Sequence, residues 1–152
     1  METETETSRN REAVVQFSVF TPNRLGRLYD LIRLLSARNV QVLAMTVLDT
    51  TDSAIVRFVV DDPDKARTLL DEEKFPFTES VLVVVEVGAP EDLAQLMSAL
   101  LEAELNINYL YSFIPHPNGK SLLGLNLEDN EMAEKILKRH QFRVLRQSDI
   151  LR

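Results

Sequence analysis

Apolar residues recur along the chain in two spacings, alternating where strands are expected and returning every third or fourth position where helices are expected. In the first half this pattern predicts a strand, a helix, two strands, a short helix and a closing strand. Their expected ranges are 14–20, about 26–38, 40–48, 53–60, from 63 onward, and through Phe75 and Phe77. The helical faces are expected to be Leu28, Leu31, Ile32 and Leu35, and then Ala66, Leu69 and Leu70. Asp62 and Pro63 are the expected cap and first residue of the short helix.

The second half repeats this order, with strands expected at 81–87, 106–114, 121–127 and 142–145, and helices at 91–103 and 130–139. The longer helix is expected to pack through Leu93, Leu96, Met97 and Leu100. Leu28 matches Leu93 at a separation of 65 residues, and Leu70 matches Leu137 at 67. The two extra residues fall at the expected hairpin turn 117–119, where insertions are tolerated. The pattern therefore indicates an internal duplication.

A βαββαβ unit with right-handed crossovers forms a four-stranded antiparallel sheet with both helices on one face, the ferredoxin-like arrangement. The expected fold class is α+β, with two tandem ferredoxin-like domains at 13–79 and 80–152. Residues 1–12 are rich in Thr and Glu and are expected to form a disordered tail. The exposed sheet faces and edges favour packing between the halves and a homodimer.

Composition narrows the class of protein further. The 152-residue chain has no cysteine, which excludes disulfides and thiolate chemistry and favours a reducing, cytoplasmic location. A net charge of −7 without a basic cluster argues against nucleic acid as a partner. The longest apolar run, residues 81–85, is too short to cross a bilayer, so no membrane association is expected.

Candidate catalytic groups are sparse. His116 and His140 occupy unrelated positions of the two repeats, and no His-x-x-x-His or Gly-rich phosphate loop is present. Acidic residues gather at 61–64 and 128–131, where helix capping explains them better than a cation site. The sequence thus predicts no catalytic residue, no metal and no cofactor, and a protein that is not an enzyme.

The two strand-to-helix turns differ in charge. A helix N-terminus offers free amides and partial positive charge to an anion. In the first turn Arg24 and Arg27 add positive charge, Asn23 adds hydrogen-bonding groups and Gly26 allows close approach, whereas the second turn carries Glu91 and Asp92. The residues alone predict one turn open to a carboxylate and one closed by its own acids. A tight turn with nothing bound is the alternative explanation of Gly26.

The duplicated βαββαβ order, with the pattern Asn23-x-x-Gly26-x-Leu28 after the first strand, resembles a tandem pair of ACT domains over about residues 13–150. The turn is also similar to that of the small regulatory subunit of acetolactate synthase. The resemblance implies an effector amino acid held between two ACT units by this turn and by the start of a neighbouring second strand. The implied ligand-binding residues are Asn23, Arg24, Leu25, Gly26, Asn106 and Ile107.

Three positions depart from the family pattern: Leu25 where proline is frequent, Gln41 where asparagine is frequent, and Glu91 in place of the glycine. If the halves pair through their second strands, the Gly26 turn would face Asn106 and Ile107, and the opposite site would be silent. The short connection between Phe77 and Val81 leaves open whether this pairing occurs within or between chains.

The function expected from these features is that of a non-catalytic regulatory or sensor protein that binds an amino acid or similar small carboxylate. A homodimer and a separate enzyme partner are expected with it. Three alternatives stay open: a ligand-free structural dimerisation module, a regulatory subunit of a separate amino-acid biosynthetic enzyme, and a small ferredoxin-like enzyme. The last lacks a convincing constellation of acid, base or nucleophile.

Overall fold

A computed structural model of the protein describes residues 13–22, 25–115 and 120–151. The expected disordered tail at 1–12 lies outside this range. The chain divides into two compact units, one of residues 15–80 and one of residues 81–152 with the chain start up to Val14. The predicted limits at 79 and 80 differ from this junction by one residue.

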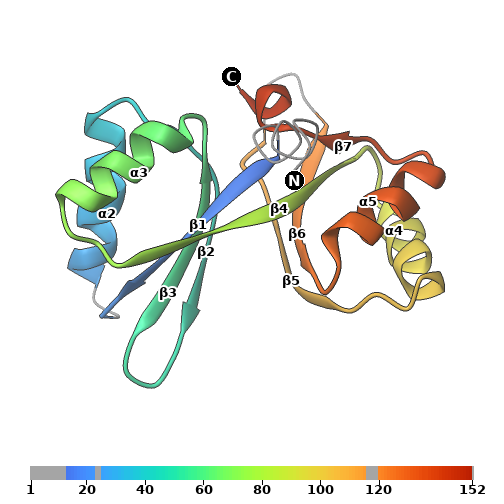
Figure 1. The fold of residues 1–152 in the computed structure, drawn as a ribbon, viewed down its shortest axis with the longest axis horizontal. Coiled ribbons are helices and arrows are strands. Elements are labelled where there is room, and N and C mark those ends of the chain that lie inside the picture. Colours follow the sequence, from blue (N-terminus) through green and yellow to red (C-terminus); the bar gives the residue numbers. More distant parts are fainter. Residues whose placement is uncertain (1–12, 23–24, 116–119, 152) are drawn as a thin grey trace, which may run out of the picture. The chain divides into compact units, whose positions relative to one another are not determined.

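The first unit contains a four-stranded antiparallel sheet in the order β2-β3-β1-β4, with two helices on one face (Figure 1). Its elements are β1 (Val14–Thr21), α2 (Leu25–Ala37), β2 (Val42–Asp49), β3 (Ala54–Val60), α3 (Pro63–Glu72) and the start of β4 (Phe77–Val87). Phe17 of β1 pairs with Phe58 of β3, and their stacked rings lie 5.6 Å apart between centroids. Leu31 and Leu35 of α2 and Leu70 of α3 bury fully against this sheet.

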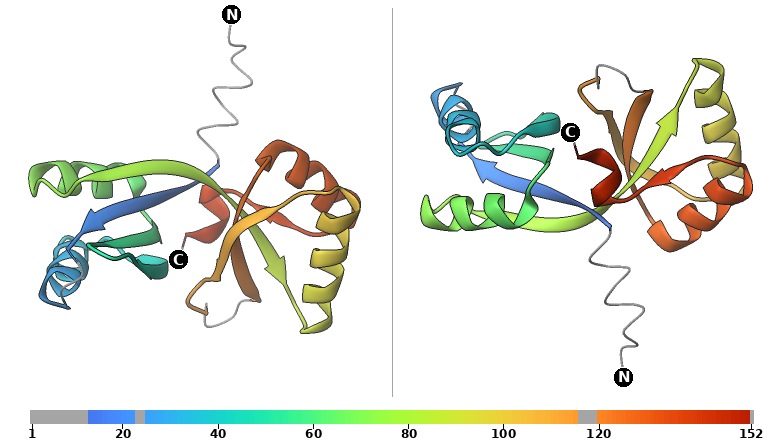
Figure 2. Two further views of the ribbon diagram at one scale, coloured as in Figure 1. Left: turned by 90° about the horizontal axis from the view of Figure 1, so that it is seen from below. Right: turned by 90° about the horizontal axis from the view of Figure 1, so that it is seen from above.

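The second unit has the same topology, with strand order β5-β6-β4-β7 and both helices on one face (Figure 2). Its elements are the rest of β4, α4 (Glu91–Glu102), β5 (Ile107–Ser112), β6 (Ser121–Leu127), α5 (Asn130–Arg139), β7 (Val144–Leu145) and the 3₁₀ turn η1 (Gln147–Ile150). Its core joins Val85, Leu96, Leu125 and Leu137. The two units confirm the predicted α+β class and the ferredoxin-like order.

The predicted repeat is also visible in the backbone, at the end of every helix. The second residue after each of the four α-helices has positive φ, at Asn39, Lys74, Glu104 and Gln141. The next residue donates its N–H to a carbonyl five positions earlier, in the pairs Val40 to Leu35, Phe75 to Leu70, Leu105 to Leu100, and Phe142 to Leu137. This is the Schellman ending, which satisfies free carbonyls at a helix C-terminus. Sequence reasoning missed it because none of the four residues is glycine.

Three other predictions need correction. The strands expected to be separate around Phe77 and Val81 form one strand, β4, so no loop connects the repeats. Leu93 and Met97 of α4 are 44% and 37% exposed, because this helix buries Leu96, Ala99 and Leu100 instead. The closing strands also begin later than expected, since Phe75 and Phe142 precede β4 and β7.

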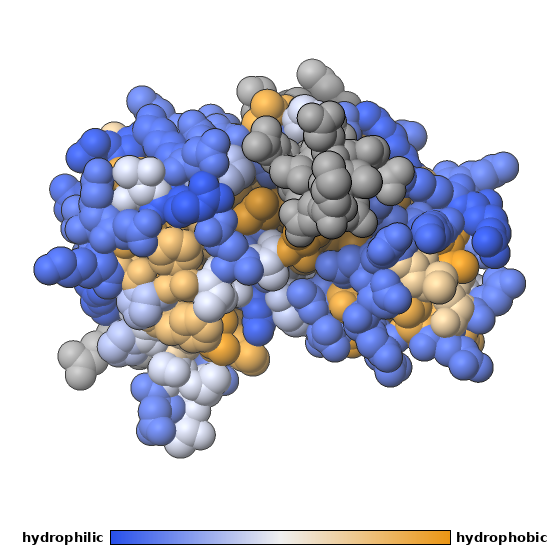
Figure 3. Space-filling model, in the orientation of Figure 1, coloured by the Kyte–Doolittle hydropathy of each residue, from blue (hydrophilic) through white to orange (hydrophobic). Residues whose placement is uncertain are grey.

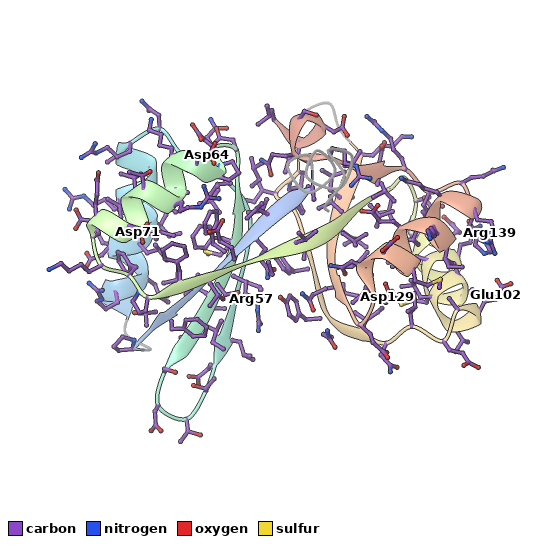
Figure 4. All side chains as sticks on the ribbon, viewed as in Figure 1. Arg57, Asp64, Asp71, Glu102, Asp129 and Arg139 are labelled. Carbon is purple, nitrogen blue, oxygen red and sulfur yellow. The ribbon has the colours of Figure 1, made fainter. Side chains whose placement is uncertain are left out.

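The caps of the two short helices confirm the capping explanation for one acid in each cluster, Asp62 and Asp129. Asp62 accepts the backbone N–H of Lys65 at 3.1 Å, and Asp129 accepts that of Met132 at 3.0 Å. Figure 4 shows Asp129 at the start of α5 and Arg139 at its end, which places opposite charges where the helix dipole favours them.

On the face drawn in Figure 3, exposed apolar side chains lie among many hydrophilic residues. Three of these, Met45, Val47 and Leu48, belong to β2, which is an edge strand of its unit. No helix in the part of the chain that the structure describes is long and apolar enough to cross a membrane.

Candidate ligand-binding site

The N-terminus of α2 lies directly after β1 and is the turn that the sequence analysis favoured. The first turn of α2 contains no acidic residue. The first amides of a helix have no partner within it, so this end carries partial positive charge. The described part of this helix start therefore holds no carboxylate that would repel an anion.

Gly26 is the second residue of α2, within the helix. Its φ is not positive, and a Cβ added at this position would meet no heavy atom within 4 Å. Among the described residues, neither the backbone conformation of Gly26 nor the packing around it therefore requires a glycine. Glycine also weakens a helix relative to alanine. What the glycine provides is open space beside the first turn.

Arg27 holds its positive charge close to this end of the helix. Its guanidinium carbon lies 4.7 Å from the centroid of the Phe75 ring, a cation–π contact. Its Nη1 lies 3.9 Å from Asp30 Oδ2, at the edge of ion-pair distance. The Phe75 ring comes from the segment before β4, so tertiary structure fixes the place of this arginine.

The corresponding N-terminus of α4 is closed by its own side chain. Asp92 Oδ2 accepts the backbone N–H of Gly88 at 2.7 Å and that of Ala89 at 3.0 Å. Sequence reasoning gave this role to Glu91 and Asp92 together, and the structure assigns the two hydrogen bonds to Asp92. An anion at this turn would have to displace a carboxylate that already holds the turn amides. The two helix starts thus differ in chemistry although they occupy the same place in the repeat.

The start of β5 carries the other predicted pair, Asn106 and Ile107. Asn106 is exposed, and its Nδ2 donates to Glu128 Oε2 at 3.0 Å. Its backbone N lies 3.4 Å from the same oxygen, and its carbonyl accepts the N–H of Glu128 at 3.1 Å. Ile107 is half-buried against the core of its unit, so its side chain serves packing.

The first unit has a related but shorter arrangement at the start of β2. Gln41 donates its backbone N–H to Asp61 Oδ1 at 2.8 Å, and its carbonyl accepts the N–H of Asp61 at 3.1 Å. Asp61 and Glu128 therefore tie the second strand of each repeat to the end of the third. Sequence reasoning assigned these acids to helix capping and missed this role. The signal was their recurrence one position before each capping aspartate.

Of the six predicted binding residues, Asn23 and Arg24 lie outside the described residues, as does the Leu25 side chain. Gly26 lies at the start of α2 in one unit, and Asn106 and Ile107 lie together at the start of β5 in the other.

In the described ranges, no group of three or more His, Asp or Glu residues is arranged to hold a metal ion. His140 ends α5, with Nε2 3.3 Å from Glu102 Oε2, and borders a groove of about 350 Å³ between α4 and the end of α5. The groove is also lined by Ala94, Gln95, Ser98 and Phe142. His116 lies outside the described residues.

Comparison with known proteins agrees with this architecture. The family model described as an ACT domain pair matches residues 12–152. The chain therefore belongs to the ACT domain pair family, whose domains are regulatory modules.

Among solved structures, a protein from Bacteroides thetaiotaomicron is similar at 27% identity and a TM-score of 0.84, covering 93% of this chain and 97% of that one. The regulatory subunit of aspartate kinase from Thermus thermophilus, in a ligand-free form, is similar in fold at 19% identity and a TM-score of 0.60, covering 85% and 91% of the two chains. The corresponding subunit from Thermus flavus has 16% identity, a TM-score of 0.58 and coverage of 86% and 92%. No curated protein matches.

Proposed function

We propose that this protein is a non-catalytic regulatory protein that binds a free amino acid or a similar small carboxylate. The ligand carboxylate docks at the N-terminus of α2, beside Gly26, in a site completed by Asn23, Arg24 and Leu25. The start of a second strand, at Asn106 and Ile107 of this chain or of a second copy, supplies the remaining contacts. Binding favours one packing of ACT units over another and so shifts an equilibrium that a partner senses.

One observation carries this proposal: the two equivalent helix starts have opposite properties. The first turn of α2 has no acid and has open space at Gly26. The first turn of α4 is held by Asp92 at 2.7 Å from Gly88. A protein that used both turns only for structure would gain from closing α2 in the same way, because a helix N-cap is worth about 1 kcal/mol.

The regulated partner is proposed to be a separate enzyme of amino-acid metabolism, and the protein is proposed to act in the cytoplasm as a homodimer. Membership of the ACT domain pair family supports a regulatory role. Purification of the tagged protein from its own cells, with and without added amino acids, tests for a stable enzyme partner.

The decisive experiment is calorimetric titration with the twenty amino acids, followed by two substitutions at equivalent positions. Gly26→Glu places a carboxylate beside the open helix start and is expected to abolish binding. Glu91→Gly, at the matching position of α4, is expected to leave binding unchanged. Unchanged affinity in Gly26→Glu together with lost affinity in Glu91→Gly would contradict the proposal.

A ligand-free dimerisation module is the second candidate function, and the apolar side chains on edge strand β2 favour it. Exposed edge strands with apolar side chains tend to pair with another chain. A stable dimer by analytical ultracentrifugation, together with no thermal shift from any amino acid, would support this second function over the first.

A further inference from the structure

The aromatic ring of Phe75 has a counterpart in the second repeat, Phe142, at the separation of 67 residues that relates this part of the two repeats. In the first unit the Arg27 guanidinium covers the Phe75 ring, with its carbon 4.7 Å from the ring centroid. The position that matches Arg27, at a separation of 65 residues, is Asp92. Asp92 holds amides of the turn before α4, so this position brings no cation to Phe142. No cation–π contact covers Phe142 in the part of the chain that the structure describes.

Open space lies beside Phe142 in the second unit. The groove of about 350 Å³ is lined by this ring together with Ala94, Gln95, Ser98 and His140. Its volume is within the range of small-molecule sites, roughly 300–1,000 Å³. The first repeat has longer side chains at two of these positions, Tyr29 in place of Ala94 and Arg33 in place of Ser98. The second repeat therefore combines an uncovered aromatic ring with room for a ligand next to it.

The charge of α4 favours a cation in this groove. Helix α4 carries three acids and no lysine or arginine, whereas α2 carries two arginines and one aspartate. One of the three acids, Glu102, occupies the position of Ala37 in the first repeat. It stands at the end of α4 (Figure 4), and its Oε2 lies 3.3 Å from Nε2 of the groove residue His140. The Glu102 side chain is 72% exposed, so its carboxylate can accept hydrogen bonds from a ligand in the groove.

A guanidinium group fits these surroundings better than an anion or a neutral group. It stacks on aromatic faces and donates two parallel hydrogen bonds to a carboxylate. The first unit already forms such a stack with its own side chains. Gln95 and Ser98 add neutral hydrogen-bonding groups. Lys138 and Arg139 bring positive charge to the last turn of α5, which disfavours a polyamine with several charges.

We propose that the groove between α4 and the end of α5 binds a small compound with a single guanidinium group, which lies over the Phe142 ring and pairs with Glu102. The ligand takes the place in the second repeat that the Arg27 side chain takes in the first. All the residues that form this site belong to the second unit. The site goes beyond the function proposed above and does not depend on it.

The probe for this site is butylguanidine, which has one positive charge and no carboxylate. Its neutral isostere, butylurea, is the matched control ligand. NMR titration of isotope-labelled protein follows the backbone amide signals of residues 94–98 and 140–142. Butylguanidine is expected to bind with a Kd of roughly 1–10 mM, and butylurea at least about fivefold more weakly. Absence of saturable shifts at these residues, or equal binding of the two compounds, overturns the proposal.

Three substitutions test the residues of the groove. Phe142→Leu removes the ring and is expected to raise the Kd of butylguanidine about threefold to tenfold. Glu102→Gln removes the charge and is expected to raise it about threefold to fivefold. Ala94→Tyr places the first-repeat residue in the groove and should abolish binding. Glu131→Gln, in the first turn of α5, removes the same charge nine residues before His140 and is expected to leave the Kd unchanged.

The exposed positions keep the test decisive. Phe142 is half-buried against the core, so its substitution can disturb folding, whereas Glu102 and Ala94 are exposed. Unchanged Kd in either Glu102→Gln or Ala94→Tyr overturns the proposal. Weaker binding in both, with an unchanged Kd in Glu131→Gln, supports it. Because butylguanidine has no carboxylate, a failure here leaves the proposed function standing, and failure of all amino acids to bind leaves this site standing.

Discussion

Leu82 packs directly over Gly124, so closely that a Cβ at position 124 would stand 2.5 Å from Leu82 Cδ2. Phe113 lies against the same position, with Cε1 3.4 Å from that Cβ. Gly124 belongs to β6 and pairs with Val84 of β4 and Tyr111 of β5, so it lies in the interior of its sheet. The missing side chain is what admits Leu82 and Phe113 to this face.

Gly124→Ala is accordingly expected to destabilise the protein by about 1–3 kcal/mol, the range for overpacking a filled site. The measurement is the free energy of unfolding from urea titration. Gly88→Ala is the matched control, because its Cβ would find its nearest neighbours at the ordinary distances of 3.6 and 3.8 Å. Equal effects of the two substitutions would contradict the packing argument.

Glu104→Gly is expected to stabilise the protein by about 0.5–1 kcal/mol. Glu104 has φ of 55° after α4, a conformation that is unfavourable for residues with a side chain but not for glycine. Asn39→Gly, at the matching position after α2, should give a smaller gain because asparagine tolerates this conformation. Differential scanning calorimetry of both variants checks the order, and a larger gain at position 39 would refute it.

Asp92→Ala is expected to cost about 1 kcal/mol of stability, because two turn amides lose their acceptor. Glu91→Ala, one residue earlier, removes the same charge without either of those hydrogen bonds and should cost less. Urea midpoints of the two variants measure the difference. A greater loss in Glu91→Ala would show that charge alone stabilises this helix start.

Arg27→Asp tests whether the absence of an acid at the start of α2 is needed for ligand binding. It places an acid in the first turn of α2 at the position that Asp92 occupies in the repeat, so ligand affinity should fall on the order of tenfold or more. Arg33→Asp makes the same charge change farther along α2 and should affect affinity much less. Calorimetric titration with the tightest-binding amino acid separates a local effect from a change in net charge.

Arg67→Lys is expected to lower stability by about 0.5–1 kcal/mol, since lysine cannot reproduce a two-point contact. Arg67 donates from Nε and Nη2 to Glu79 at 2.9 and 2.6 Å and from Nη1 to Asp64 at 2.8 Å. The hydrogen bonds to Glu79, followed by those to Asp64, raise the pKa of Arg67 above its usual range.

The sign of that pKa shift predicts a pH dependence. A raised pKa in the folded state stabilises the protein wherever the unfolded chain is still protonated at this group, which for arginine means below about pH 12. Titration of Arg67 itself should therefore cause no loss of stability between neutral pH and about pH 10. Unfolding curves of the protein and of Arg67→Lys should stay separated by a constant free energy between neutral pH and about pH 9, below the range in which lysine itself titrates.

Much of the fold follows from local sequence signals. Asp129 as a cap and the periodicity behind it were enough to place α5 at its observed ends. The junction between the repeats was harder to predict. Thr78, Glu79 and Ser80 are polar, as residues of a loop commonly are. Ser80 accepts a hydrogen bond from buried Gln16, and Glu79 binds Arg67, so these polar groups find partners within a strand. Such tertiary partners cannot be read from neighbouring residues alone.

In the candidate site, too, some features could be predicted from the sequence and others could not. The charge contrast between the two helix starts was visible in the sequence, because residue type alone determines it. The place of Gly26 inside α2 depends on where the helix begins. The choice of Asp92 over Glu91 and the contact from Glu128 to Asn106 depend on the directions of side chains. A difference of one methylene group in side-chain length, as between Asp61 and Glu128, cannot be recognised from the spacing of residues.

The four helix endings have a consequence for how far relatives of this chain can diverge. Asparagine, lysine, glutamate and glutamine occupy one backbone conformation there, and hydrogen bonds between main-chain groups hold it in each case. Because nearly all residues have the same main-chain groups, mutation can replace these side chains without disrupting the Schellman ending. A backbone conformation that main-chain hydrogen bonds hold can persist while the side chains change. The two copies of a duplicated unit can therefore diverge in surface sequence and still keep the same fold.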